Sequence, residues 1–144
     1  AAGIEFEGIA SYHDDRGGKL RGKNTIFCFE MDGVRVCHLG DLGHLLSEKE
    51  VAALGRVDVL MIPVGGAFTL DGEGAKKVVG QINPRIVMPM HFKTLAVPKS
   101  FGIYPADDFF SGQQVERPGH TLTVSKKSLP TKGEGPLVVM LDYK

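Results

Sequence analysis

The chain has 144 residues, which corresponds to one domain, and we treat residues 1–144 as that single domain. Its 17 basic and 17 acidic side chains cancel, which removes the general electrostatic case for binding nucleic acid or a membrane surface. No apolar run approaches the roughly 20 residues of a membrane span, and no signal peptide precedes the first strand pattern, so we expect a cytoplasmic chain.

The first part of the chain predicts three strands. Residues 4–12 alternate apolar and polar side chains, as a half-buried strand does. Residues 24–31 and 34–39 flank Asp32-Gly33, a strong hairpin signal. Cys28 and Cys37 lie in these two apolar runs. We expect two buried thiols, with a disulfide across the hairpin as the open alternative.

Helices and strands alternate after the hairpin. Ser47 and Glu50 form a capping-box pattern for a helix that ends at Gly55, and Asp71 caps a second helix that Pro84 stops. This alternation predicts an α/β layered domain. The remaining expected elements are strands at 57–64, 85–90, 121–124 and 137–141 and a short helix at 106–110.

Three candidate metal ligands share one type of position. His13, Asp41 and His91 each follow a predicted strand. In an open sheet, ligand sites gather at the carboxyl ends of the strands, so we expect the three side chains at one rim. Imidazole and carboxylate are ligands that Zn²⁺ prefers. The spacing alone is weak evidence, and loop residues without a ligand role are the alternative.

The residues around these candidates are more specific. From about residue 4 to residue 141, the series resembles the metallo-β-lactamase superfamily, closest to the branch with L-ascorbate-6-phosphate lactonase and Zn-dependent hydrolases. The resemblance implies that His13 completes a three-histidine first metal site, that Asp41 bridges two metals and that His91 binds the second. The motifs that carry it are Ala10-Ser11-Tyr12-His13, Leu39-Gly40-Asp41 and Pro89-Met90-His91-Phe92.

The His-x-His-x-Asp-His signature of that superfamily is absent from this sequence. The resemblance therefore implies the C-terminal half of a metallo-β-lactamase-like αβ/βα sandwich, without its N-terminal half. The implied cofactor is one or two Zn²⁺ ions, or Mn²⁺ or Fe²⁺. Because only three ligands are present, a single loosely held ion or an empty site is expected.

The function implied is that of a metal-dependent hydrolase acting on a small-molecule substrate. A metal-bound hydroxide would attack an ester, a lactone or a phosphoester, and Asp41 would also position the nucleophilic water. The alternative is a non-catalytic or degenerate domain of the same fold that acts in assembly or ligand binding.

Four further residues are candidates to support the ligands or to meet the substrate. For His38 we favour a packed, hydrogen-bonded histidine, and for Asn24 we slightly favour hydrogen bonding at a strand edge; orienting a ligand is the alternative for both. His44 is expected either to reach the substrate or support a ligand, or to serve at the entry of the next helix. Thr94 is expected either to contact an anionic substrate or to lie in a solvated loop. The charged loop at residues 14–16 is expected only to be solvated.

The apolar runs at 57–64 and 85–90 are typical of strands covered on both faces. We expect that cover to come from a partner chain, a missing segment or a dimer. The chain is therefore predicted to form a homo-oligomer or to associate with a missing N-terminal half.

Overall fold

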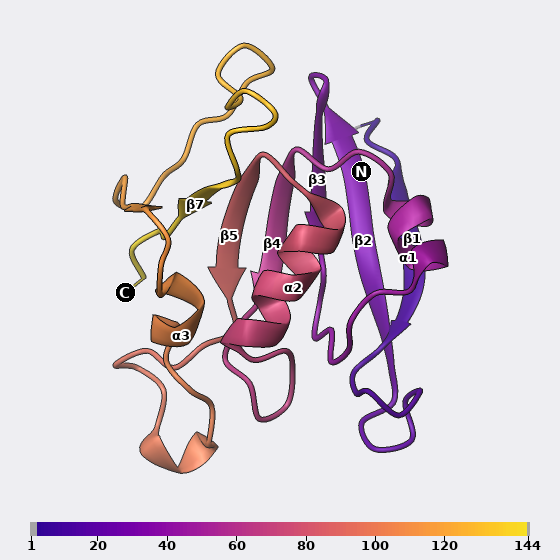
Figure 1. The fold of residues 1–144 in the computed structure, drawn as a ribbon, viewed down its shortest axis with the longest axis vertical. Helices are drawn as coiled ribbons and strands as arrows, with labels where there is room; N and C mark the ends of the chain where they lie inside the picture. The colour runs from indigo at the N-terminus through magenta and orange to yellow at the C-terminus, as the bar shows by residue number, and fades with distance from the viewer. Residues whose placement is uncertain (1–2, 144) are drawn as a thin grey trace.

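The computed structural model describes residues 3–143 and contains one seven-stranded sheet in the order β1-β2-β3-β4-β5-β7-β6 (Figure 1). The strands are β1 (Phe6–Tyr12), β2 (Lys23–Met31), β3 (Val34–His38), β4 (Val59–Pro63), β5 (Ile86–Met90), β6 (Val115–Glu116) and β7 (Leu137–Val139). The helices are α1 (Glu48–Leu54), α2 (Gly72–Ile82) and α3 (Asp107–Phe110), with a 3₁₀ turn, η1, at Lys99–Phe101.

Strand direction brings four chain segments to one edge of the sheet. β2 is antiparallel to both β1 and β3, so β1 and β3 run the same way. β4 and β5 continue parallel to β3. The carboxyl ends of β1, β3, β4 and β5 therefore share one edge, at the bottom of Figure 1, which we call the carboxyl edge.

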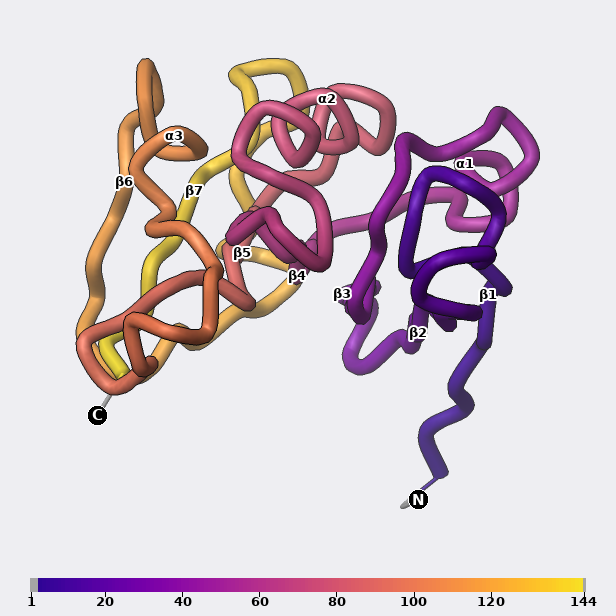
Figure 2. The backbone as a smooth tube through the Cα atoms, turned by 90° about the horizontal axis from the view of Figure 1, so that it is seen from below, coloured from indigo at the N-terminus to yellow at the C-terminus, as the bar shows by residue number. Residues whose placement is uncertain are grey.

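Helices α1 and α2 cover one face of the sheet, as Figure 2 shows from below. The apolar residues of α2 recur at helical spacing and are buried against this face: Ala75, Val78, Val79 and Ile82. Both predicted caps are confirmed. Asp71 accepts a hydrogen bond from the Gly74 N–H at 2.7 Å, and Ser47 and Glu50 form a complete capping box. Among residues 3–143, no helix combines the length and the hydropathy that crossing a membrane requires.

The opposite face of the sheet carries a second, smaller apolar core. Val59 and Ile86 are buried there, and Leu122 and Val124 pack against them. The chain itself therefore supplies part of the cover that these strands need. The prediction of a strand at 121–124 is wrong. This segment packs on the sheet face and does not pair with any strand of the sheet. The cover does not extend over Phe27 on β2, which is 51% exposed.

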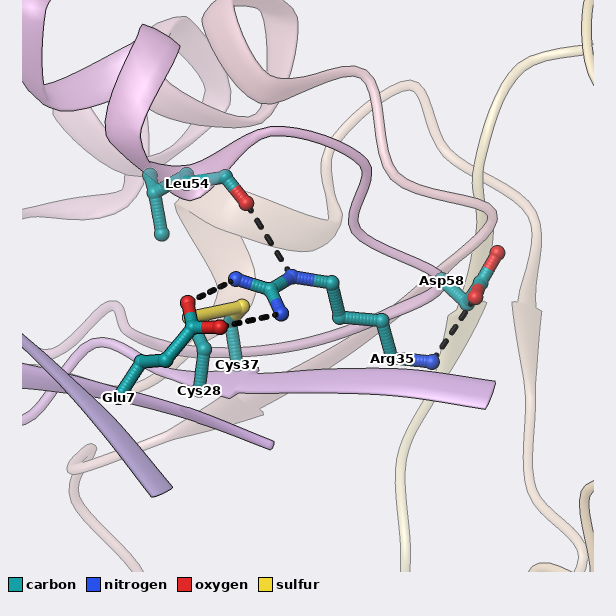
Figure 3. Close-up of a disulfide and its surroundings, with 6 residues drawn as sticks. All are labelled: Glu7, Cys28, Arg35, Cys37, Leu54 and Asp58. Atoms are coloured by element: carbon teal, nitrogen blue, oxygen red, sulfur yellow. Dashed lines mark hydrogen bonds and ion pairs between the residues drawn. A yellow bond between two sulfur atoms is a disulfide. The ribbon is translucent and has the colours of Figure 1, made fainter. Parts of the chain in front are cut away.

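Cys28 and Cys37 form a disulfide, so the expectation of two thiols is wrong and the open alternative is confirmed (Figure 3). The two residues lie directly opposite each other on β2 and β3, with Cα atoms 4.2 Å apart, and both are fully buried. Directly opposite residues of antiparallel strands bring their side chains into contact. Disulfides are rare in cytosolic proteins. The bond therefore speaks against the cytoplasmic location expected from the sequence, and that location stays a prediction.

Arg35 lies beside the disulfide and ties four elements together (Figure 3). Its guanidinium donates to Glu7 of β1 at 2.7 Å and to the Leu54 carbonyl at the end of α1 at 3.2 Å. Its backbone N–H donates to the carboxylate of Asp58, just before β4, at 2.9 Å. These contacts fix the relative positions of β1, β3, α1 and β4, and so of the loops that leave them at the carboxyl edge.

Candidate metal centre

The carboxyl edge brings His13, Asp41 and His91 together. His13 follows β1, Asp41 lies in the loop after β3, and His91 follows β5. The Nε2 atom of His13 is 4.0 Å from Oδ2 of Asp41, and the Nε2 atom of His91 is 3.9 Å from Oδ1. Each carboxylate oxygen of Asp41 therefore faces a different imidazole. The shared rim expected from strand order is present in the structure.

The residues present offer the imidazole and carboxylate donors that a divalent cation binds. The Nε2 atom of His13, which faces Asp41, is buried and has no hydrogen-bond partner among the described residues; in His91 the unpartnered atom is Nδ1, not the Nε2 atom that faces Asp41. A buried polar atom without a hydrogen-bond partner lowers the stability of the fold by about 1–3 kcal/mol. A bound group that takes up the free lone pair of the ring nitrogen is therefore expected. Zn–N and Zn–O bonds together span at most about 4.3 Å. The separations of 4.0 and 3.9 Å lie within that limit but are wider than the tetrahedral angle of Zn²⁺ gives, so the side chains would have to close in on a bound ion.

The three residues do not amount to a complete site. Within residues 3–143, no group of three His, Cys, Asp or Glu side chains stands in an arrangement ready to hold a metal ion. Asp41 is about half exposed, whereas both imidazoles are about a quarter to a third exposed. The open side of Asp41 leaves space for further groups.

His91 has an unusual backbone conformation. Its φ is 51°, in the left-handed region that residues other than glycine rarely adopt. The Gly65 N–H after β4 donates to the His91 carbonyl at 3.1 Å. A Cβ at Gly65 would lie 2.2 Å from that oxygen, so no other residue fits there without a shift. The glycine at position 65 therefore allows a close backbone approach to His91.

Asn24 holds the backbone of Asp41. Its Oδ1 accepts the Asp41 N–H at 3.0 Å, and its Nδ2 donates to Ser11 Oγ at 2.8 Å and to the Leu39 carbonyl at 2.9 Å. Gly40 has φ 60°, and a Cβ there would lie 2.4 Å from Asn24 Oδ1. Asn24 therefore fixes the turn that presents Asp41, which goes beyond the strand-edge role favoured from sequence.

His38 lies at this turn, and Thr94 lies in the segment after His91. His38 is exposed, and its Nδ1 accepts the Gly40 N–H at 3.0 Å. The expected hydrogen bonding is present, but the expected packing is wrong, because His38 lies at the end of β3 on the sheet face without helices. Thr94 lines a hollow of about 340 Å³ together with Met90 and His91.

Asp14, the residue after His13, has a structural role that was not predicted from the sequence. It is only 3% exposed, so the expectation of a merely solvated loop is wrong for this residue. Its carboxylate accepts backbone N–H groups of Arg16, Gly18, Leu20 and Arg21 at 2.7–3.0 Å. Burial would raise the pKa of Asp14, but these four donors outweigh it and lower the pKa to about 2. The carboxylate organises the loop that follows His13.

Comparison with known proteins agrees with this architecture. A family model described as "Beta-lactamase superfamily domain" matches residues 1–91. A UPF0173 metal-dependent hydrolase of Thermoplasma acidophilum is 34% identical over 97 residues, which cover 63% of this chain and 43% of the relative. The chain thus spans less than half the length of this relative.

Solved structures share the fold. A Thermotoga maritima protein, described as a candidate Zn-dependent hydrolase of the metallo-β-lactamase superfamily, is 37% identical with a TM-score of 0.78; the match covers 96% of this chain and 65% of that one. A metallo-β-lactamase fold protein of Bacillus subtilis has 8% identity and a TM-score of 0.56 over 99% of this chain and 48% of its own, which shows the fold alone. The chain belongs to the β-lactamase superfamily and has the α/β fold of the metallo-β-lactamases.

Proposed function

We propose that this chain contributes His13, Asp41 and His91 to the metal site of a hydrolase that acts on an ester, a lactone or a phosphoester. The observation that carries the proposal is the position of Asp41, with one carboxylate oxygen toward each imidazole. The relatives described as metal-dependent hydrolases support it. Zn²⁺, Mn²⁺ and Fe²⁺ all accept imidazole and carboxylate ligands.

The residues of the chain would divide the work. A bound divalent cation supplies a Lewis acid that polarises the substrate and lowers the pKa of water to near 7. His13 and His91 present ring nitrogens to it. Asp41 accepts a hydrogen bond from the attacking water and so orients it toward the substrate. Asn24 keeps the Asp41 carboxylate in place through the backbone.

The rest of the site would come from outside these residues. The helix-free face of the sheet exposes Phe6, Phe27 and Met31 at 57%, 51% and 51%. The chain covers 43% of its Thermoplasma relative, so much of the length of such a protein is unaccounted for. We propose that the remaining part packs on this face and adds metal ligands, with a homo-oligomer as the alternative source of cover.

Metal titration of purified protein tests the proposal. We expect the wild-type chain to take up Zn²⁺ or Mn²⁺ in a defined ratio, and Asp41→Asn to bind it at least about 10-fold more weakly because the charge of the carboxylate between the two imidazoles is lost. Asp15→Asn is the matched control, since it makes the same charge change on an exposed side chain two residues from His13.

Hydrolysis of a generic phosphodiester and of a simple lactone completes the test. Turnover that depends on added metal and on Asp41 would support the hydrolase. A metal-free, inert chain with a defined oligomeric state, or an Asp41→Asn variant that binds metal as the wild type does, would contradict it. Such a result would favour a non-catalytic domain that acts in assembly.

A further inference from the structure

His44 connects the loop that carries Asp41 to the strand that carries His13. It lies three residues after Asp41, and its side chain is 15% exposed. The Nε2 atom lies 3.1 Å from the backbone nitrogen of Tyr12, the last residue of β1. The Nδ1 atom lies 2.8 Å from the carbonyl oxygen of Leu45.

These two partners define where the ring proton sits. The backbone N–H of Tyr12 can only donate, so Nε2 of His44 must accept. The carbonyl of Leu45 can only accept, so Nδ1 must donate. Only the neutral ring with its hydrogen on Nδ1 satisfies both contacts. The other neutral tautomer and the imidazolium would each place an N–H against the N–H of Tyr12.

A second contact runs between the same two segments. The Gly43 N–H donates to the Tyr12 carbonyl at 3.1 Å, so both polar backbone groups of Tyr12 bond to residues 43–44. β1 is the outer strand of the sheet, and this bonding occupies the end of its free edge. A Cβ at Gly43 would lie 2.4 Å from the carbonyl carbon of His13. The loop after β3 therefore packs closely against the backbone that carries His13.

The start of α1 also lies beside His44, but without a hydrogen bond to it. Glu50 Oε1 lies 3.7 Å from Nε2 of His44, while Oε2 of the same carboxylate accepts the Ser47 N–H at 2.7 Å in the capping box. The Tyr12 ring lies against the imidazole with centroids 5.9 Å apart. His44 is therefore restrained by its hydrogen bonds to the strand and to its own loop, and by packing against the Tyr12 ring.

We propose that His44 is a positioning residue that holds His13 at its distance from Asp41 through a neutral ring protonated on Nδ1. It touches neither the metal position nor a reacting atom; it acts through Tyr12 and Gly43. The proposal rests on the proposed function only for its metal-binding readout, because the location of the ring proton and the Tyr12 bond are measurable without metal.

Three variants of the full chain separate positioning from general stability. In His44→Gln the side-chain oxygen can accept the Tyr12 N–H in place of Nε2, whereas His44→Leu fills similar space without an acceptor. Ser47→Ala is the control, since it removes capping bonds of α1 but leaves the His44–Tyr12 bond. All three are compared by Co²⁺ titration and by thermal unfolding.

We expect His44→Leu to weaken Co²⁺ binding about 10–100-fold, as loss of groups that orient ligands does. His44→Gln should stay within about threefold of wild type, and Ser47→Ala should lower the Tm without changing Co²⁺ affinity. Wild-type affinity in His44→Leu, or equal loss in the Gln and Leu variants, would overturn the proposal.

Two metal-free measurements distinguish failure of this proposal from failure of the proposed function. Nitrogen NMR of the imidazole should show His44 protonated on Nδ1 and bare on Nε2. Amide exchange of Tyr12 should be at least about 10-fold faster in His44→Leu than in wild type. If the wild-type chain binds no metal, the proposed function fails while these two results still decide the role of His44. A proton on Nε2, or unchanged Tyr12 exchange, would refute it.

Discussion

Single carboxylates set the geometry of the carboxyl edge. Asp41 lies between two imidazoles, and Asp14 gathers four backbone N–H groups into one loop. Hydrogen bonds from several backbone N–H groups stabilise the charged form of a buried carboxylate. The loop after His13 is therefore ordered by Asp14, and the loop after β3 by Asn24 and Gly40.

Asp14 makes a specific prediction about acid stability. Its pKa in the folded protein is lowered to about 2 from an ordinary value of 3.8, so its contribution to stability is present above pH 4 and is lost as the pH falls from about 4 to about 2. Asp14→Asn should be less stable than wild type at pH 7, because an amide oxygen cannot replace both carboxylate oxygens.

Urea unfolding at several pH values measures this effect. The stability difference between wild type and Asp14→Asn should shrink between pH 4 and pH 2, whereas exposed Asp15→Asn should track wild type throughout. A difference that stays constant from pH 7 to pH 2 would show that the charge of Asp14 does not stabilise the loop.

The candidate ligands could be predicted from sequence, but their supports could not. His13, Asp41 and His91 each follow a recognisable strand, and strand ends determine which edge they reach. Asp14 sits in a run of charged residues that resembles any solvated loop, and its burial depends on the path of residues 15–21. Asn24 meets Asp41 only because β2 and β3 pair in one register.

At the scale of elements, the helices and strands that were predicted correctly are encoded by patterns within their own residues. α2 has apolar residues at helical spacing and a cap at each end, and β4 and β5 are continuous apolar runs. The two failures depend on distant partners. Residues 121–124 alternate as a strand does but lie on a sheet face, and β6 has two residues, too few for any periodicity.

The hairpin of β2 and β3 should depend on its disulfide. The cysteines are nine residues apart in sequence, and closing a loop of this size contributes about 2–3 kcal/mol to the free energy of unfolding. We expect reduction, or the double change Cys28→Ala and Cys37→Ala, to lower that free energy by about this amount in urea unfolding. Thiol labelling of the denatured chain should find no free thiol before reduction. Two reactive thiols in the unreduced protein would contradict the bond.

At the scale of the whole molecule, the two faces of the sheet differ. Helices α1 and α2 cover one face (Figure 2). Among residues 3–143, the other face is covered over parts of β3, β4, β5 and β7 by a segment that includes Leu122 and Val124. Apolar side chains on β1 and β2 remain exposed beside this cover. The apolar runs at 57–64 and 85–90 could predict that both faces need cover, but not that residues 122–124 of the same chain supply part of it.

This open face predicts association. Phe27→Glu places a charge on β2 where the apolar face is open, and should reduce self-association of the chain, or its binding to the remainder of the longer protein. Leu95→Glu is the control, because Leu95 is 100% exposed in a loop. Sedimentation velocity measures both variants. Equal behaviour of the two would mean that this face is not an interface.

X-ray absorption at the metal edge tests the shared coordination by His13, Asp41 and His91 most directly. The wild-type chain loaded with Zn²⁺ should show a nitrogen and oxygen shell at about 2.0–2.1 Å with two imidazole scatterers and no sulfur. His13→Gln and His91→Gln should each lose one imidazole. Two imidazoles retained in both variants, or bound Zn²⁺ without imidazole in its shell in the wild type, would contradict the account.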